Sequence, residues 1–555
     1  MNRMAQEEKN RRSAEKNGFV VNFMGGVSFR WNALDTLKMV SASSIFAEPA
    51  YYRDGQYAPM GISDSIAKTD PLFADHVVSL LRRFDGMTTT QVMEKAIDEA
   101  LDWDFKATLE WDATLRNEYY MRLNPQVIMV RAAIHPGRQD FTRENPGFFA
   151  EIQKKVMLRA DEPASQFLYY LFRKGSKSAL PSILKRSWAR RIEAMSRYEI
   201  YKYRNAGVGL IDTVRVCHAG GELVDELMRT GTVTPEEEEK TWETMRSSGS
   251  KWQEILDTIH IGHMALLRNL RGIFSEISDT ARAKAILEDL KAGVRKGKQF
   301  PFRYYSAYQA IINDPDVHHR RMVLDALEEC VDIACDNMPK LKGRAICLSD
   351  NSGSAWGAFT SEYGRVTVAV IDNLSSVITA RNSDEGIVGK FGDKLIRTDI
   401  SKRNGVLKQA EEISRSRYSD IGGSTECGVW LFFKEAIEKR EHFDHIFIYS
   451  DMQAGHGGLY GTPEETSVYS KAGYSCRGHY INVAKLIADY RKKVNPKVNV
   501  YSVQTAGYNN VVIPENGYRT ALMYGWTGRE LVYADAINRF WDEKDFSFPA
   551  DVQTP

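Results

Sequence analysis

The fold of the C-terminal part is decided by the stretch 345 AICLSDNSGS 354, in which an apolar run, Ala345 to Ser349, leads directly into Asp350, Ser352 and Ser354. In an open α/β sheet, ligands bind beyond the carboxyl ends of the strands. One carboxylate and two hydroxyls, two residues apart on a tight glycine-containing loop, can all point at one ion. These hard oxygen donors suit Mg²⁺, so the stretch predicts a strand that ends in a divalent-cation site.

Strand-like and helical segments alternate on either side of this stretch. The other strand-like runs are Val366 to Ile371, His445 to Ser450, Val498 to Val503 and Arg519 to Tyr524. Helical segments, such as Gly428 to Lys439 and Tyr480 to Lys492, fall between them, and Asp384 to Lys402 resembles an extended loop. Strands that alternate with helices predict a mostly parallel sheet covered on both faces, and we expect this doubly wound α/β domain over residues 341–555.

Two later loops offer the remaining ligands of a cation site. Gly422 to Thr425 precedes a helix, and the strand at His445 to Tyr449 leads into Ser450 and Asp451. The five candidate ligands are Asp350, Ser352, Ser354, Thr425 and Asp451, with Ser424 as the alternative to Thr425. This DxSxS…T…D pattern resembles the metal-ion-dependent adhesion site of von Willebrand factor A domains. The resemblance implies a bound divalent cation, for which Mg²⁺ fits best and Mn²⁺ and Ca²⁺ are alternatives.

The residues beside this pattern indicate a docking site and not an enzyme. A cation with an open coordination position can hold a carboxylate of a partner protein. No general base or nucleophile accompanies the ligands, and His456, on a glycine-rich loop, is better explained as an exposed side chain. A metal-dependent hydrolase is the minor alternative.

The first part of the chain has a different pattern. From Gly18 to about residue 340, apolar residues recur at spacings of three and four, which predicts helices. A capping box at Thr234 to Glu237 predicts the start of one helix, and Gly293 is expected to end another that runs from Ala281 to Ala292. Many short amphipathic helices in series favour an all-α solenoid of irregular HEAT type, with a compact helical bundle as the alternative.

Composition excludes several classes of protein. The 555 residues are 43% hydrophobic and 26% charged, as in ordinary globular proteins. Residues 1–17 form a charged tail without the apolar core of a signal peptide, and no apolar run is long enough for a membrane span. Six cysteines without a CxxC pair favour a reducing cytoplasm over a disulfide framework. The net charge of +1 gives no global attraction to nucleic acid, so any RNA site must be a local patch.

One such patch interleaves basic and aromatic side chains. Its members are Lys185, Arg186, Arg190, Arg191, Tyr198, Tyr201, Lys202, Tyr203, Arg204 and Arg215, with His218 one helical turn beyond Arg215. The cations can neutralise phosphates, and the tyrosines can stack on unpaired bases. A solvated helix face with tyrosines in the core is the competing interpretation.

Several stretches of the helical part, in their order along the chain, match those of a known protein family. They are Gly25 to Phe29 with Tyr51-Tyr52, Leu180 to Trp188, Lys202 to Arg204, Asp212 to His218, His263 to Leu270 and Pro301 to Tyr308. In this order, and followed by an A domain, they resemble the Ro autoantigen family, whose ring is called the TROVE domain. The resemblance spans nearly the whole chain and implies a closed ring of irregular helical repeats over residues 18–340.

The resemblance also implies a function in RNA metabolism. In this family, single-stranded ends of misfolded non-coding RNAs enter the hole of the ring, and small Y RNAs bind its outer surface. Bacterial members resemble adaptors of exoribonucleases, tethered by a Y RNA. The family's RNA contacts match Lys185 or Arg186, Arg215 and His218, and we add Lys202, Arg204 and Arg268 as candidates.

We therefore expect a monomeric, cytoplasmic, membrane-free RNA-binding protein that acts in non-coding RNA quality control or as an adaptor to an exoribonuclease. The alternative is an RNA-independent interaction scaffold that uses a metal-dependent docking domain.

Overall fold

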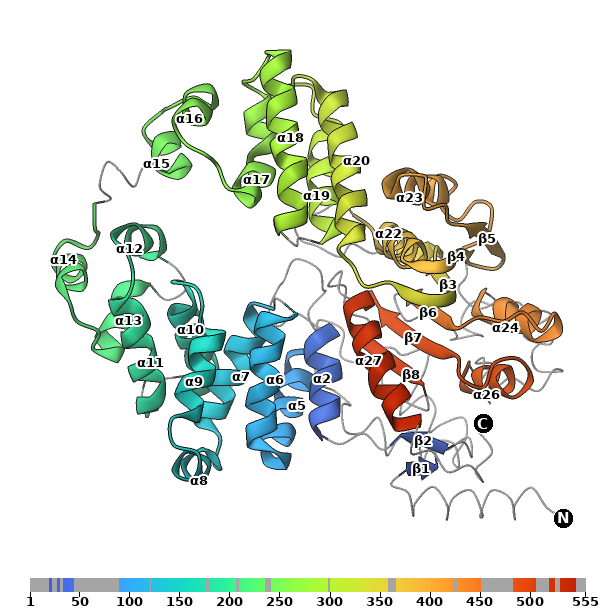
Figure 1. Cartoon of the computed structure of the whole chain (residues 1–555), viewed down its shortest axis with the longest axis horizontal. Helices are drawn as coiled ribbons and strands as arrows, with labels where there is room; N and C mark the ends of the chain where they lie inside the picture. Colours follow the sequence, from blue (N-terminus) through green and yellow to red (C-terminus); the bar gives the residue numbers. More distant parts are fainter. Residues whose placement is uncertain are drawn as a thin grey trace. The chain divides into compact units, whose positions relative to one another are not determined.

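The computed structural model describes residues 19–21, 27–29, 33–43, 89–119, 121–175, 177, 179–205, 209–234, 241–297, 300–357, 366–423, 428–450, 483–505, 519–524 and 530–545. They divide into two compact units (Figure 1). One unit, called here the helical unit, comprises Trp31–Ala47 and Thr90–Gly262; the other, the sheet unit, includes His263–Pro555. None of the described helices is both long enough and apolar enough to span a membrane.

The helical unit consists of short helices that pack on their neighbours in sequence. They are α2 (Ala33–Ser43), α5 (Thr89–Trp103), α6 (Phe105–Asn117), α7 (Leu123–Ile134), α8 (Arg138–Glu144), α9 (Phe148–Val156), α10 (Glu162–Lys174), α11 (Ser182–Glu193), α12 (Arg197–Tyr203), α13 (Leu210–Cys217), α14 (Glu222–Thr230), α15 (Trp242–Ser247) and α16 (Trp252–Thr258). Helices close in the chain, such as α6 with α7 and α9, or α11 with α13, pack against each other. This stacking of neighbours is typical of a solenoid. The capping box predicted at Thr234 to Glu237 lies outside the described residues, except for Thr234.

A buried polar network fixes the packing of four of these helices. The Gln166 amide donates to Gln126 on α7 and accepts from Gln153 on α9, both at 2.7 Å. The Trp188 indole N–H, on α11, also donates to the Gln166 side-chain oxygen at 2.8 Å. All four side chains are buried. Because an unpaired buried amide costs about 1–3 kcal/mol, this network favours one register of α7, α9, α10 and α11.

The sheet unit begins with four helices: α17 (His263–Phe274), α18 (Thr280–Gly297), α19 (Pro301–Ile311) and α20 (Arg320–Asp336). The prediction that Gly293 ends a helix is wrong, because α18 continues through it to Gly297. A Cβ at Gly293 would lie 2.3 Å from Nδ1 of His263 on α17. The His263 ring is fixed there by a 2.8 Å hydrogen bond between its Nε2 and the Tyr304 hydroxyl on α19. Glycine is therefore required for close packing of α17 on α18.

The rest of this unit is an α/β domain with a six-stranded sheet. Its strands are β3 (Leu341–Asp350), β4 (Ser383–Phe391), β5 (Leu395–Asp399), β6 (His445–Ser450), β7 (Asn499–Gln504) and β8 (Thr520–Tyr524), in the order β5-β4-β3-β6-β7-β8. All neighbours are parallel except β4 and β5. The sheet helices are α22 (Val368–Arg381), α23 (Val406–Ser414), α24 (Gly428–Glu438), α26 (Val483–Lys493) and α27 (Glu530–Asp545). Strand order reverses between β3 and β6, which is the topological switch point of a doubly wound sheet. The predicted fold class, a helical part followed by a doubly wound α/β domain, is confirmed.

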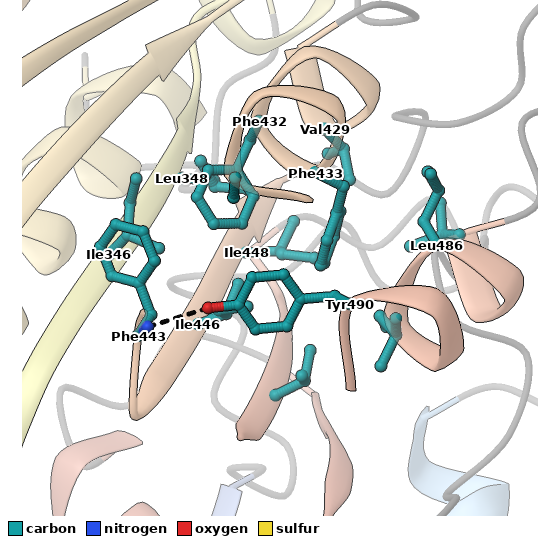
Figure 2. Packing of buried hydrophobic residues seen from close by; sticks show 14 of the residues in the cluster. Ile346, Leu348, Val429, Phe432, Phe433, Phe443, Ile446, Ile448, Leu486 and Tyr490 are labelled. Atoms are coloured by element: carbon teal, nitrogen blue, oxygen red, sulfur yellow. Dashed lines mark hydrogen bonds between the residues drawn. The ribbon is translucent and has the colours of Figure 1, made fainter. Parts of the chain in front are cut away.

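The main core of the α/β domain lies on one face of this sheet (Figure 2). Ile346 and Leu348 of β3 and Ile446 and Ile448 of β6 point toward aromatic and aliphatic side chains of two helices. The helix residues are Val429, Phe432 and Phe433 on α24 and Leu486 and Tyr490 on α26. The Tyr490 hydroxyl also accepts a 2.8 Å hydrogen bond from the Phe443 backbone N–H, just before β6. This packing fixes the direction in which β3 and β6 present their carboxyl ends.

Two segments of the α/β domain were predicted wrongly. The run at Val366 to Ile371 is not a strand but leads into α22, and Asp384 to Lys402 is not a loop but contains most of β4 and all of β5. Helix α22 is buried on almost every face, including Asp372, Asn373, Ser375 and Ser376, so its apolar residues lack the amphipathic period of a surface helix. Strand β5 is a short edge strand with mainly exposed or half-buried side chains, which removes the alternation expected of a strand.

The predicted division between residues 340 and 341 falls immediately before β3, whereas the compact unit that contains the sheet already begins at His263. Helix α20 contacts the α/β domain directly. The Val406 backbone N–H, at the start of α23, donates to the Asp332 carboxylate of α20 at 3.0 Å. Helices α17 to α20 therefore pack as one unit with the sheet.

Candidate metal centre and nucleic-acid interface

The loop after β3 brings together the first three predicted metal ligands. Asp350 is the last residue of β3, and its Oδ1 accepts the Ser352 backbone N–H at 2.9 Å. The Ser352 and Ser354 hydroxyls lie 3.0 Å apart. Asp350 Oδ2 accepts the Ser450 hydroxyl at 2.7 Å, which joins the ends of β3 and β6. These side chains therefore meet at the switch point of the sheet, where a doubly wound fold binds its ligands.

The chemistry of this loop fits a cation. Asp350 is fully buried, and burial raises the pKa of its carboxyl group, an effect that the hydrogen bonds from Ser450 and Ser352 oppose. Within the described residues, neutral N–H and O–H groups donate to Asp350 and no basic side chain forms an ion pair with it. A buried carboxylate without a positive partner is costly, and a bound cation removes that cost. The candidate ligands Thr425 and Asp451, the alternative Ser424, and His456 lie outside the described residues.

A buried amide pair that we did not predict from the sequence supports this loop. Asn351 donates to Oδ1 of Asn373 on α22 at 2.8 Å, and Asn373 donates back to Asn351 at 3.0 Å. Asn373 Oδ1 also accepts the Ser349 hydroxyl at 2.7 Å, and its amide nitrogen donates to Ser414 on α23 at 2.8 Å. Both asparagines are fully buried. A polar residue within the apolar run of α22 was the available signal.

The segment that leads toward Thr425 is anchored to the same loop. The Gly353 backbone N–H donates to the Gly423 carbonyl at 2.9 Å, and Lys394 N–H donates to the Ile421 carbonyl at 2.8 Å. The buried ammonium of Lys390, near the end of β4, contacts Asp420 at 2.8 Å. These contacts place residues 420–423 beside Ser352 and Ser354.

The predicted RNA contacts at Lys185, Arg186, Arg215 and His218 lie on two helices, α11 and α13, that pack against each other. The C-terminal end of α13 lies beside α11, because the Gly220 backbone N–H, just after α13, donates to the Glu193 carboxylate of α11 at 3.1 Å. His218 caps that end with a left-handed backbone and is exposed. The structure therefore places the candidates Lys185 and Arg186 on a helix that packs against α13, which carries Arg215 and ends at His218.

The cations of α11 and α13 differ in how free they are to bind phosphate. Among the described residues, Lys185, Arg186 and Arg190 have no carboxylate partner, and Arg186 and Arg190 are exposed. Arg215 is exposed and shares a 3.3 Å contact with exposed Asp212, and Arg191 pairs with Glu199 at 2.9 Å. The exposed Arg215–Asp212 pair contributes at most about 1 kcal/mol and exchanges readily with a phosphate, whereas Arg191 and Glu199 are half-buried.

Two other candidates are already engaged within the protein. Lys202, on α12, contacts the Glu243 carboxylate at 2.9 Å and the Tyr198 hydroxyl at 3.0 Å. The Arg204 guanidinium lies over the Tyr201 ring and hydrogen-bonds the Tyr201 carbonyl. The predicted stacking of Tyr198 and Tyr201 on bases therefore competes with intramolecular cation–π contacts. Arg268 is exposed on α17, which belongs to the sheet unit, whereas the other candidates belong to the helical unit.

Comparison with known proteins agrees with this architecture. The family model of the TROVE domain matches residues 227–332. The crystal structure of the Ro (RSR) protein of Deinococcus radiodurans is similar, with a TM-score of 0.56 at 15% sequence identity, over 80% of this chain and 93% of that chain. No curated protein matches the chain in sequence. Residues 227–332 thus match the TROVE domain, and the described part of the chain has the fold of this Ro protein.

Proposed function

We propose that this chain is an RNA-binding protein of the Ro type whose α11–α13 face binds RNA phosphates. The observation that carries the proposal is a set of cations on α11 with no carboxylate partner among the described residues, Lys185, Arg186 and Arg190. This helix packs against α13, where Arg215 and His218 are exposed. A protein of nearly neutral net charge gains nucleic-acid affinity only where such charges are concentrated. The TROVE domain match and the Ro fold support this assignment.

The kinds of RNA and the cellular role that we propose follow from the resemblance to the Ro family. We infer that small Y-type RNA and single-stranded ends of misfolded RNA are the ligands, in RNA quality control or as a tether to an exoribonuclease. The protein acts in this proposal as a monomeric, non-catalytic binding factor in the cytoplasm. The RNA-independent scaffold remains the alternative, because the metal loop offers a docking function of its own.

The test is a fluorescence-anisotropy titration with a stem-loop RNA that carries a short single-stranded 3′ tail. The triple variant Lys185→Ala/Arg186→Ala/Arg215→Ala is expected to bind at least about a hundredfold more weakly, since each phosphate contact adds to an electrostatic affinity. The matched control, Arg143→Ala/Lys154→Ala/Lys155→Ala, removes three exposed cations of the same unit from α8 and α9 and is expected to keep most of the affinity. Equal weakening in both triple variants would show that RNA binding depends on the overall charge of the protein and not on the α11–α13 face.

For the α/β domain we propose a bound divalent cation, Mg²⁺ in the first place, held by Asp350, Ser352 and Ser354 with Thr425 and Asp451. When bound, the cation supplies an open coordination position for a carboxylate of a partner. Thermal unfolding with and without Mg²⁺, Mn²⁺ or Ca²⁺ tests this site. A cation at one hundred times its Kd stabilises the folded state by about 2.7 kcal/mol, and Asp350→Ala is expected to remove that increment.

A further inference from the structure

One arginine beside the metal loop (residues 350–354) is not explained by the contacts described above. Arg417, in the segment that follows α23, is exposed and has no carboxylate partner in the described part of the chain. Its backbone is left-handed, with a φ of 48°, a conformation that favours glycine and costs other residues about 1–3 kcal/mol. A charged side chain kept at such a position indicates a role for the side chain itself.

The guanidinium of Arg417 is held next to the metal loop. It lies 5.4 Å from the ring centroid of Trp356, on the short helix α21 (Gly353–Gly357) that continues this loop. The Trp356 backbone N–H donates to the Ser352 carbonyl at 3.1 Å, so the indole follows a proposed metal ligand by one helical turn. Trp356 is half-buried and packs against Val368 at the start of α22, which fixes the ring under the guanidinium.

A second set of contacts joins the same segment to the loop. The Gly353 backbone N–H donates to the Gly423 carbonyl at 2.9 Å, and the Gly422 N–H donates to the Tyr418 carbonyl at 2.8 Å. Gly422 has a φ of 85°, so the chain turns sharply there and brings Tyr418 back toward the loop. The segment that carries Arg417 is therefore fixed beside the metal loop at two points, one in the side chains and one in the backbone.

The charge around this part of the loop is positive. Residues 390–394 and 415–423 contain four basic residues and two acidic ones. Of the acidic residues, Asp420 is paired with buried Lys390 at 2.8 Å, and Asp393 is half-buried. The two arginines of the second segment are exposed. This surface therefore favours an anionic ligand.

A guanidinium that lies over an aromatic ring is well placed to bind a carboxylate. Such stacking uses the flat face of the group and leaves its in-plane N–H donors free for two parallel hydrogen bonds to one carboxylate. A cation in the metal loop would hold a different carboxylate of the same ligand. The exposed cations here are too few to follow a phosphate backbone, whose binding adds up over many contacts.

We propose that Arg417 determines the specificity of the metal site, and that the partner is an acidic protein segment with two carboxylates, one for the cation and one for the Arg417 guanidinium. The inference rests on the proposed metal-dependent docking function and names the chemistry of the partner. A ligand held at two points gains affinity because its second contact forms within the complex. The site thus distinguishes an acidic segment from a single acidic residue.

The experiment measures binding of fluorescein-labelled peptides to the full chain in Mg²⁺ by fluorescence anisotropy. One peptide carries a single glutamate in a glycine–serine background, and a series carries a second glutamate one to four residues further on. The best peptide with two glutamates is expected to bind about tenfold more tightly than the peptide with one, as a charge-assisted hydrogen bond allows. Removal of Mg²⁺ with EDTA is expected to abolish binding of both kinds of peptide.

Arg417→Gly is the decisive variant, because glycine suits the left-handed backbone. We expect an unchanged or higher midpoint of thermal unfolding, unchanged affinity for the peptide with one glutamate, and loss of the tenfold preference for two. A residue that only shaped the chain would leave the preference intact. Arg417→Lys is expected to keep part of the preference, since it retains the charge but not the paired donors.

The matched control is Arg403→Ala, which removes an exposed arginine just before α23, at the opposite end of that helix from Arg417. It is expected to keep the full preference. An intact preference in Arg417→Gly, or equal losses in Arg417→Gly and Arg403→Ala, would overturn the inference while docking as such persisted. If the unaltered protein bound no peptide in Mg²⁺, the proposed docking function itself would be wrong, and terbium luminescence would show whether the cation still binds. Single-stranded RNA that bound in Mg²⁺, displaced the peptides and was lost in Arg417→Gly would replace the acidic segment as the ligand.

Discussion

At the scale of single residues, the intramolecular partners of a cation decide whether it is available to RNA. Lys185 and Arg186 have no carboxylate partner in the described part of the chain, whereas Lys202 contacts Glu243 and Tyr198. The two kinds of residue are indistinguishable in the sequence, where both belong to one basic and tyrosine-rich stretch. A cation that must leave a carboxylate to reach a phosphate gains less on binding.

This difference gives a prediction for two single substitutions. Arg186→Ala is expected to weaken RNA binding several-fold and to reduce the slope of log K against log salt concentration by about 1. Lys202→Ala is expected to change the affinity less than twofold, because its ammonium already has an anionic partner. Anisotropy titrations at four salt concentrations measure both quantities. A larger loss in Lys202→Ala than in Arg186→Ala would show that α12, not α11, is the main contact.

At the scale of secondary-structure elements, one glycine controls how α17 meets α18. In Gly293→Ala, the new methyl group would overlap the His263 ring, which the Tyr304 hydroxyl holds in place. Overpacking of this kind typically costs about 1–3 kcal/mol. We therefore expect a lower midpoint of thermal unfolding, although alanine favours helices more than glycine does. Gly262→Ala, one residue before α17, has no atom within 4 Å of the new Cβ and is the control. A gain in stability in Gly293→Ala would contradict the contact.

The amide pair between the metal loop and α22 gives a second prediction at this scale. Asn373→Ala leaves the buried Asn351 amide and the Ser349 hydroxyl without their partner on α22. Loss of a residue that orients metal ligands typically lowers metal affinity about 10- to 100-fold. Terbium luminescence or manganese electron paramagnetic resonance measures that affinity directly.

The control for this prediction is Asn382→Ala, at the residue that follows the C-terminal end of α22. Its buried amide donates to the Ile378 carbonyl at 2.8 Å and has no contact with the metal loop. Asn382→Ala is expected to lower stability but to keep the metal affinity. If the two variants lost metal to the same degree, the effect would be one of global stability and not of positioning.

At the scale of the whole molecule, the small net charge limits the electrostatic part of RNA binding. With a formal charge of +1, attraction must come from the few cations of one surface. Each neutralised phosphate of a single strand contributes about 0.7 to the slope of log K against log salt concentration. Three or four contacts therefore predict a slope of about −2 to −3. A much steeper slope, measured by anisotropy between 50 and 400 mM salt, would require further basic surface outside α11 and α13.

The sequence by itself determined the class of fold and supplied the residues proposed for the two candidate sites. The apolar run at Ala345 to Ser349 followed by Asp350, Ser352 and Ser354 predicted β3 and a loop that brings these side chains together, because strand period and residue spacing are local properties. That the loop binds a cation stays a prediction. The helices of the first part could also be predicted from the local sequence, because apolar residues at spacings of three and four indicate amphipathic helices. The order of the family-like stretches predicted the Ro resemblance, which the TROVE domain match and the fold confirm.

Only the tertiary structure decided which residues act together. Because α22 is buried on almost every face, the sequence at its start has the apolar pattern of a strand. Gly293 packs against His263 and does not end its helix. The Asn351–Asn373, Lys202–Glu243 and Gln166–Trp188 contacts all join residues that are distant in the chain. Such pairs form only when helices and strands pack, because their free energy depends on desolvation and on partners that the local sequence does not specify.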